Sequence, residues 1–348
     1  MAVATKEAPR RLGERTFRFP AEPRIVATGS IAGRMEAEGP LGAEFDETVS
    51  DSLLGQASWE RAERELMRRA VEHAVRKAGW TLGDVDFMFG GDLLNQIVST
   101  SFAARDLDIP AFGLFSACAT LTAALTLAAM AVDGGYARRA LAAVSSHHDT
   151  AERQYRFPTE FGNQRPPTAQ WTATAGAAFL LAAEGEGPRI TMATPGRVVD
   201  YGLKDPFDMG SAMAPAAADT IAAHLRDTGR DPSDYDMVLT GDLAAVGTPL
   251  VRELLAQRGY DIEDVHEDCG LLLYDRERQD VHAGGSGAAC SGATVAAHIW
   301  KRLAQGDLRR VLLVATGALH SPTTYQQGET IPCVAHAVVL EAPRAAGG

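Results

Sequence analysis

The chain has 348 residues, 46% hydrophobic and 22% charged, a composition typical of a globular protein with two domains or one large core. Its formal net charge of −12 argues against binding to nucleic acid and against docking on anionic lipid by bulk charge. Four cysteines (Cys118, Cys269, Cys290 and Cys333) are scattered without CxxC spacing, so we expect neither a disulfide framework nor a zinc site.

The predicted elements begin after a leader. Residues 1–20 are expected to form a loose leader and an edge segment, without the apolar run of a signal peptide. The first half then predicts, in order, a strand at 24–28, a loop over 35–54, a helix capped by Ser58 and ending near residue 78, a strand at 85–89, a turn at 90–93, a helix to 107 and a strand at 140–144.

Residues 109–132 carry no charge and are the most apolar stretch of the chain. A membrane span needs about 20 apolar residues, but Pro110 and Gly113 interrupt this one and Ala and Thr fill the rest. We expect a short buried strand at 111–115, a tight turn and a wholly buried helix that begins near Cys118. A thiol at a helix N-terminus tends towards a lowered pKa, and an anionic ligand finds N–H donors there. The alternative is a small buried cysteine.

The second half repeats the first. An offset of 150 places Gly91, Asp92 and Leu93 on Gly241, Asp242 and Leu243, and an offset of 172 places Cys118 on Cys290 and His148 on His320. The repeat predicts two copies of one strand–helix–strand–helix–strand unit with their central helices back to back. The expected fold class is α/β, in five layers α/β/α/β/α built from two duplicated halves. These halves cover 21–186, with the Cys118 helix and an inserted loop at 150–171, and 187–348.

A duplicated unit with a cysteine at the start of its central helix resembles the thiolase and ketoacyl synthase superfamily. Within it, eight runs resemble the stage V sporulation protein AD family: GDLLNQ (91–96), SH (146–147), AERQ (151–154), DMGSAMAPAAADT (208–220), TGDL (240–243), DCG (268–270), AGGSG (283–287) and ATGAL (315–319). The resemblance covers nearly all of residues 20–342. It implies a protein that binds dipicolinic acid (pyridine-2,6-dicarboxylic acid), alone or as its calcium chelate. The partners it implies are membrane-embedded subunits of one spore channel, at the spore inner membrane, in uptake during sporulation and release at germination.

The catalytic partners of the cysteine are missing from the expected places. Enzymes of the superfamily need a histidine that activates the thiol, and a second His or an Asn for the oxyanion. This chain has Thr240-Gly241-Asp242 at the first place and the turn 283–287 at the second, with His282 just outside. A carboxylate near a thiol also raises its pKa. We therefore expect a binding protein without enzymatic activity, cofactor or metal site. The alternative is a residual acyl-transfer enzyme that uses Cys118.

The residues expected to bind the ligand lie at the ends of strands and at the start of the central helices. They are Asp92, Asn95, Cys118, His147, Asp242 and Ser286. His147 can donate a charge-assisted bond when protonated, and the amides of Asn95 and Gln96 lie on the same rim; capping of a helix is an equal alternative for Asn95. The repeat-equivalent Asp92 and Asp242 are expected to bind backbone N–H groups at a helix start, or, as a second choice, calcium carried by the ligand. His320 is expected to be structural, because it is equivalent to His148.

The inserted loop at 150–171 combines basic and aromatic residues, as functional surface loops often do. They are Arg153, Arg156 and Arg165 with Tyr155, Phe157, Phe161 and Trp171. We expect this loop to contribute to a homodimer interface; the alternatives are a roof over the pocket and a docking site for the membrane partner. Arg153 is within possible reach of the ligand.

Overall fold

The structure is a computed structural model that describes residues 9–155 and 165–344. The first half contains β1 (Phe17–Arg18), β2 (Arg24–Ala32), α1 (Arg34–Ala37), β3 (Glu47–Thr48), α2 (Trp59–Lys77), β4 (Phe87–Gly91), α3 (Val98–Leu107), β5 (Ala111–Gly113), α4 (Thr120–Asp133), β6 (Arg139–Ser146), α5 (His148–Tyr155), β7 (Trp171–Thr172) and β8 (Ala175–Ala182). The second half contains β9 (Arg189–Thr194), α6 (Met209–Thr228), β10 (Met237–Thr240), α7 (Ala244–Ala256), β11 (His266–Asp268), α8 (Cys269–Leu272), β12 (Gly285–Ser286), α9 (Ala288–Thr294), α10 (Trp300–Gln305), β13 (Arg310–Ala318), α11 (Pro322–Gln326) and β14 (Cys333–Glu341).

The two halves have the same strand order. The main sheet runs β11-β10-β13-β14-β9-β2-β8-β6-β4-β5, and the pair Arg24–Arg189 joins β2 to β9 at its middle. Outward from this junction, the first half places β2, β8, β6, β4 and β5, and the second half places β9, β14, β13, β10 and β11. In each half the strand that follows the central helix is the third from the junction, and the two strands that precede this helix are the outermost. Directions also correspond: β8 and β14 are antiparallel to both neighbours, whereas β4 and β10 are parallel to theirs. The predicted duplication is therefore confirmed.

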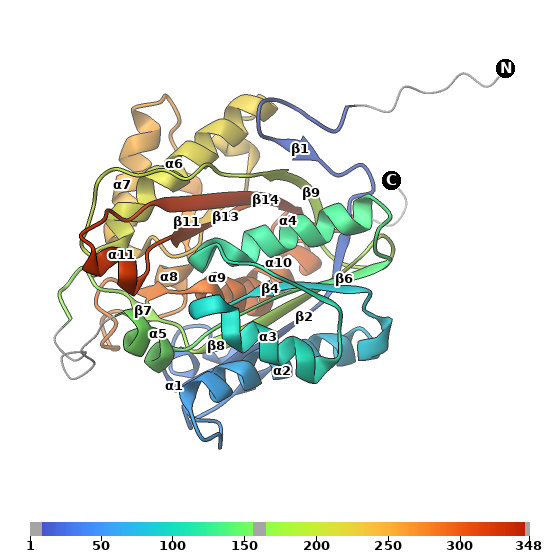
Figure 1. The fold of residues 1–348 in the computed structure, drawn as a ribbon. Helices are drawn as coiled ribbons and strands as arrows, with labels where there is room; N and C mark the ends of the chain where they lie inside the picture. The colour runs from blue at the N-terminus through green and yellow to red at the C-terminus, as the bar shows by residue number, and fades with distance from the viewer. Residues whose placement is uncertain (1–8, 156–164, 345–348) are drawn as a thin grey trace.

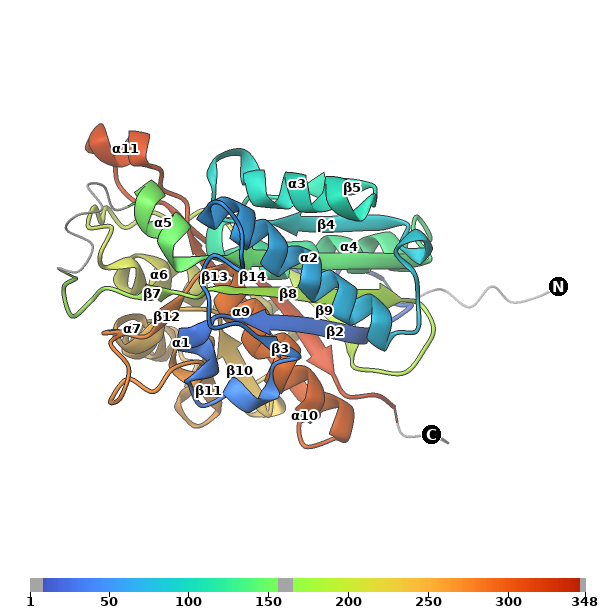
Figure 2. The same ribbon diagram turned by 90° about the horizontal axis from the view of Figure 1, so that it is seen from below.

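Helices cover both faces of each half of the sheet. Figure 1 shows α6 and α7 on one outer side, α4 and the α9–α10 run in the middle, and α2 and α3 on the other outer side. The turned view in Figure 2 looks from the side of α2 and shows this helix lying across β8. α2 packs on β2 and β8, α6 packs on β13 and β14, and α4 contacts strands of both halves. The expected five-layer α/β/α/β/α arrangement is thus confirmed.

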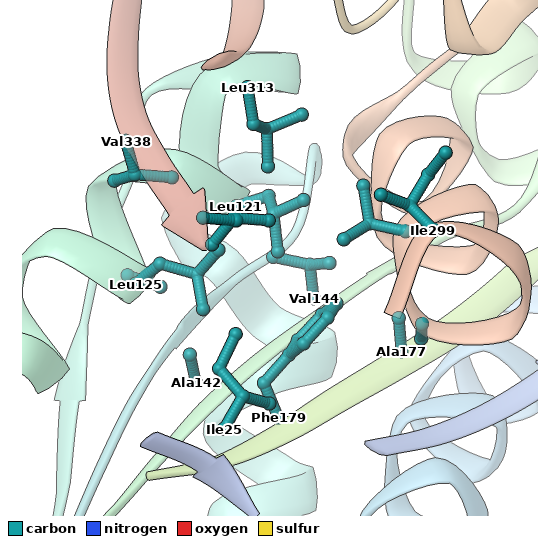
Figure 3. Packing of buried hydrophobic residues seen from close by; sticks show 14 of the residues in the cluster. Ile25, Leu121, Leu125, Ala142, Val144, Ala177, Phe179, Ile299, Leu313 and Val338 are labelled. Carbon is teal, nitrogen blue, oxygen red and sulfur yellow. The ribbon is translucent and has the colours of Figure 1, made fainter. Parts of the chain in front are cut away.

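The helix α4 can lie between two sheet layers because its side chains are small or apolar. Leu121 and Leu125 pack among Val144 and Phe179 of the first half and Leu313 of the second, so one core serves both halves (Figure 3). Thr side chains add no unsatisfied hydroxyl along this helix, since they bond back to carbonyls one turn earlier, as Thr126 does to Thr122 at 2.7 Å.

One prediction about this region is wrong. The strand expected at 111–115 is β5, which ends at Gly113 and lies exposed at the edge of the sheet. Phe112 is 56% and Phe115 48% exposed. Apolar character cannot distinguish a buried strand from an edge strand whose outer side another molecule covers. Within the described residues, no helix combines the length and the apolar composition needed to cross a bilayer.

Candidate functional site

A narrow cavity next to Cys118 lies between elements of both halves. It is lined by Leu93, Ala117, Cys118, Ala151, Tyr155, Thr172, Met209, Ser286, Ala318 and His320. These residues come from the ends of strands and the starts of helices, the place where α/β sheets bind ligands. The cavity measures about 30 Å³. That is room for about two water molecules, whereas small-molecule sites measure about 300–1,000 Å³.

Cys118 lies in a short 3-10 turn, Ala117–Ala119, immediately before α4. Ala117 has a φ of 48°, in the left-handed region, so the chain turns sharply at the cysteine. The thiol is buried, and its sulfur lies 3.9 Å from the hydroxyl oxygen of Ser286. Burial raises the pKa of Cys118 well above its ordinary value, and the nearby Asp242 carboxyl raises it further. The tendency towards a lowered pKa expected at a helix N-terminus is wrong here, because burial and a like charge outweigh the helix dipole.

Asp242 lies behind the cavity and joins its parts. Its carboxyl accepts hydrogen bonds from the Thr316 hydroxyl at 2.6 Å, the Ser286 hydroxyl at 3.1 Å and the Gly287 N–H at 3.1 Å. The side chain is buried, and burial raises the pKa of this carboxyl. It therefore fixes Ser286 beside Cys118 without lining the cavity itself.

The two repeat-equivalent aspartates have different roles. Asp92 accepts hydrogen bonds from the Leu94 N–H at 2.8 Å and the Thr100 N–H at 2.7 Å, so the predicted structural role at a helix start is confirmed for it. Asp242 also binds a backbone N–H at a helix start, but at another helix: it accepts the N–H of Gly287, which directly precedes α9, at 3.1 Å. In the second half, Asp268 accepts from the N–H groups of Leu243 and Ala244, at 2.8 and 2.9 Å. Asp268 is the last residue of β11, and it occupies the helix start of α7 as Asp92 does that of α3, whereas Asp242 lies behind the cavity.

His147 does not lie on the cavity rim, contrary to expectation. It is fully buried at the end of β6. Its Nε2–H donates to the Ser52 carbonyl at 2.8 Å, and its Nδ1 accepts the Asp149 N–H at 3.2 Å. This arrangement fixes the neutral tautomer, and burial lowers the pKa of the imidazole. A charge-assisted bond from His147 to a ligand is not compatible with this position.

Asn95 also lies outside the cavity lining. It is exposed, and its backbone N–H donates to the Gln154 side chain at 2.9 Å. The capping alternative is wrong as well, since α3 begins after Ile97 without a side-chain cap. Gln96 and Ile97 both have left-handed φ angles, 54° and 46°, which side chains rarely adopt.

Three residues that line the cavity were not expected to. His320 lines it together with Tyr155, with the two rings 5.2 Å apart, although the repeat suggested a structural role. Met209, the first residue of α6, closes another side. The Tyr155 hydroxyl donates to the Leu93 carbonyl, which ties α5 to the end of β4. The signal for Tyr155 was present in the aromatic content of the inserted loop.

The described parts of the inserted loop at 150–171 favour the alternative that this loop covers the cavity. α5 contributes Ala151 and Tyr155 to the walls, whereas Arg153 points away and pairs with Glu60. Arg165 pairs with Asp280, 3.0 Å away in the second half. Arg156, Phe157 and Phe161 lie outside the described residues.

Comparison with known proteins now adds the family. The family model for stage V sporulation protein AD (SpoVAD) matches residues 13–341. This chain belongs to the stage V sporulation protein AD family. Stage V sporulation protein AD of Bacillus subtilis (strain 168) is 50% identical over 329 residues, which cover 94% of this chain and 97% of that relative. The predicted family is confirmed, and with it a place in sporulation.

Solved structures with the same fold include a synthase and a condensing enzyme. The 3-oxoacyl-[acyl-carrier-protein] synthase III of Aquifex aeolicus VF5 is 14% identical, with a TM-score of 0.55 over 92% of this chain and 99% of its own. A tetronic acid condensing enzyme is 19% identical, with a TM-score of 0.59 over 92% and 100%. At these identities the likeness shows the thiolase-like fold alone.

For this member of the family, the cavity offers a few hydrogen-bonding groups within mostly apolar walls. The polar groups are the Cys118 thiol, the Ser286 and Thr172 hydroxyls and the His320 imidazole. In the described part of the chain, the hydrogen-bonding neighbours of the Cys118 sulfur are Ser286 and Asp242, and neither is an imidazole. A thiol in this setting stays protonated at neutral pH, so it can donate a hydrogen bond but is a poor nucleophile.

Proposed function

We propose that this chain is a non-catalytic subunit that binds dipicolinic acid, alone or as its calcium chelate. It acts with membrane-embedded subunits of a spore channel, at the spore inner membrane, in uptake during sporulation and release at germination. The observation that carries the non-catalytic part is the state of Cys118. Its thiol is buried beside a carboxyl, and its pKa is raised where an acyl-transfer enzyme needs it lowered.

Binding is supported by the chemistry of the cavity walls. A planar ring with two carboxyl groups needs hydrogen-bond donors and flat apolar contacts. Cys118 and His320 can donate, Ser286, which gives its hydroxyl hydrogen to Asp242, can accept, and Leu93 and Met209 offer apolar surface. Among the residues that the structure describes, no arginine or lysine lines this cavity, and the Asp242 carboxyl lies behind it. A ligand with its charge neutralised, such as the calcium chelate, therefore meets less repulsion than the free dianion.

The cavity must widen to admit such a ligand, because its present 30 Å³ is too small for an aromatic ring with two carboxyl groups. The hydrogen bond from Tyr155 to the Leu93 carbonyl holds α5 against the end of β4. We infer that this bond breaks when the ligand enters, so that α5 moves away from the strand ends.

Calorimetric titration of the protein with dipicolinate, with and without calcium, tests this proposal. Ser286→Ala and Cys118→Ala are expected to weaken binding several-fold. Ser291→Ala and Cys290→Ala are matched controls, since both residues are buried in α9 and neither lines the cavity. Saturable binding that only the first pair weakens supports the proposal. No heat, with no rise in melting temperature, would refute dipicolinate binding by the isolated chain.

The alternative is a residual acyl-transfer enzyme that uses Cys118. The fold and the position of this cysteine in a cavity favour it. An assay of acyl-thioester hydrolysis separates the two, because only the enzyme loses turnover in Cys118→Ala. If the wild type hydrolyses the thioester no faster than Cys118→Ala does, the enzyme alternative is refuted and the binding protein remains.

We also propose a homodimer, and we propose β5 rather than the inserted loop as its interface. Within the described residues β5 pairs on one side only, with β4, and it exposes Phe112 beside Phe115. An exposed apolar edge strand is a ready template for pairing with a second copy. Phe112→Glu is expected to shift sedimentation from dimer to monomer, and a wild-type monomer at micromolar concentration would refute this interface.

A further inference from the structure

A second, larger cavity lies on the outside of the first half, between the N-terminal end of α2 and the helix α3. It measures about 470 Å³, within the size range of sites for small molecules. Three arginines line it, Arg61 and Arg64 from α2 and Arg105 from α3, together with Phe102. We call this cavity the arginine groove.

Phe102 orients two of the three guanidinium groups. It is 43% exposed, and the guanidinium carbons of Arg105 and Arg64 lie 4.7 and 5.8 Å from the centre of its ring. Cation–π contacts of this kind hold the planar groups near the ring. Asp106 pairs with Arg105 at 2.6 Å and more loosely with Arg64 at 3.4 Å. One carboxylate is thus shared between two guanidinium groups.

Positive charge remains in the arginine groove after these pairs are counted. Glu60, the acidic residue in its lining, is already ion-paired with Arg153. Arg61 is exposed, and its guanidinium has no hydrogen bond or ion pair to any residue that the structure describes. A cavity with unmatched positive charge is notable in a protein whose net charge is −12. Such a cavity attracts small anions.

We propose that the arginine groove binds a small planar polycarboxylate anion. Guanidinium groups present paired N–H donors that match the two oxygens of a carboxylate, and the exposed part of Phe102 suits a flat ring. Dipicolinate is the anion of this class that the proposed function supplies, so the choice of ligand rests on that proposal. The groove provides cationic side chains for a free dianion, which the lining of the Cys118 cavity does not.

The two cavities are connected through α5. Arg153 of this helix pairs with Glu60 of the arginine groove, while Ala151 and Tyr155 of the same helix line the Cys118 cavity. α5 packs against α2, as the turned view in Figure 2 shows. An anion held in the arginine groove therefore lies beside the helix that must move for the Cys118 cavity to open, which makes the groove a collecting site for the ligand.

The test is calorimetric titration of the full chain with dipicolinate at low and high salt. The groove variant is Arg61→Ala/Arg105→Ala. Its matched control is Arg138→Ala/Arg309→Ala, which removes two side chains that are 90% and 84% exposed and lie outside both cavities. We expect a salt-sensitive binding event in the wild type and the control, weakened at least tenfold in the groove variant. Melting curves show that each variant is folded.

Ser286→Ala keeps the two proposals apart. Two binding events, one weakened only by Ser286→Ala and the other only by the groove variant, would support both the Cys118 cavity and the arginine groove as binding sites. Loss in the groove variant alone supports the arginine groove and refutes the Cys118 cavity as the site. If the groove variant and its control give the same isotherm, the arginine groove is refuted as a binding site, whatever the result for Ser286→Ala.

Competition defines the ligand class. Benzene-1,3-dicarboxylate has the ring and the two carboxylates of dipicolinate, whereas inorganic phosphate has only the charge. We expect the dicarboxylate to displace dipicolinate from the arginine groove at concentrations at least tenfold below those of phosphate. Equal displacement by the two would overturn the assignment of a planar polycarboxylate.

Discussion

Glu36 is a buried carboxyl at a contact between the two halves. It lies in α1, and its Oε1 accepts hydrogen bonds from the Thr174 N–H at 3.0 Å and from the Tyr274 hydroxyl, which belongs to the second half. Its Oε2 is buried without a hydrogen-bond partner among the described residues. Burial raises the pKa of Glu36 from 4.5 to about 7, and the hydrogen bonds lower it only in part.

The free energy of unfolding should therefore depend on pH through this residue. Because the pKa is raised in the folded state, the contribution of Glu36 to stability is fully present below pH 4.5 and is lost as pH rises towards 7. Each pKa unit corresponds to about 1.4 kcal/mol, so the loss amounts to about 3 kcal/mol above pH 7. Glu36→Gln keeps the size and the acceptor oxygen of the side chain but cannot ionise. We expect the variant to exceed the wild type by less than about 1 kcal/mol at pH 5 and by about 3 kcal/mol at pH 8.

Urea unfolding at several pH values between 5 and 8.5 measures this difference. Glu38→Gln is the control. Glu38 directly follows the same helix, and its side chain is 52% exposed. Other buried acids, such as Asp268, are present in all three proteins, so their effects cancel in the comparison. Parallel curves of wild type and Glu36→Gln across this range would refute the argument that burial holds the proton on Glu36.

Three further predictions concern the Cys118 cavity and its supports. At pH 8, Cys118 should react with iodoacetamide far more slowly in the folded protein than in the unfolded chain. Asp242→Asn should speed this reaction in the folded protein by lowering the pKa of the thiol. Equal rates in wild type and Asp242→Asn would contradict the role of Asp242. Asp92→Ala should lower the free energy of unfolding by about 2–4 kcal/mol, because it leaves buried N–H groups unpaired, and a loss below 1 kcal/mol would contradict this. Tyr155→Phe should speed dipicolinate association in stopped-flow measurements, and an unchanged rate would mean that its bond to Leu93 does not limit entry.

The sequence alone determined the architecture, because repeated residues at matching positions indicate that the backbone follows the same path twice. Residues repeated at offsets of 150, as Gly91 and Gly241, and of 172, as Cys118 and Cys290, predict two copies of one chain path. The same strand order in both halves then follows. Ser58 marked the start of α2 for a local reason, since its side chain accepts the Arg61 N–H. Such signals depend on neighbours in the sequence, and they need no knowledge of distant contacts.

The candidate site was decided by contacts between distant segments. Asp242 and Asp92 are equivalent in the repeat, but Asp268 of β11 binds the N–H groups at the start of α7, and Asp242 binds Ser286 and Thr316 instead. His147 was buried by Ser52, which comes from a loop far earlier in the chain.

The pKa of Cys118 and the membership of His320 in the cavity follow the same principle. Helix position favours a thiolate at Cys118, yet burial between the halves and the Asp242 carboxyl reverse the direction. His320 has the same place in the repeat as His148, and only the tertiary structure brings it beside Tyr155 of α5. A repeat fixes where the backbone runs, whereas the direction, burial and protonation of each side chain depend on which other segments fold over it.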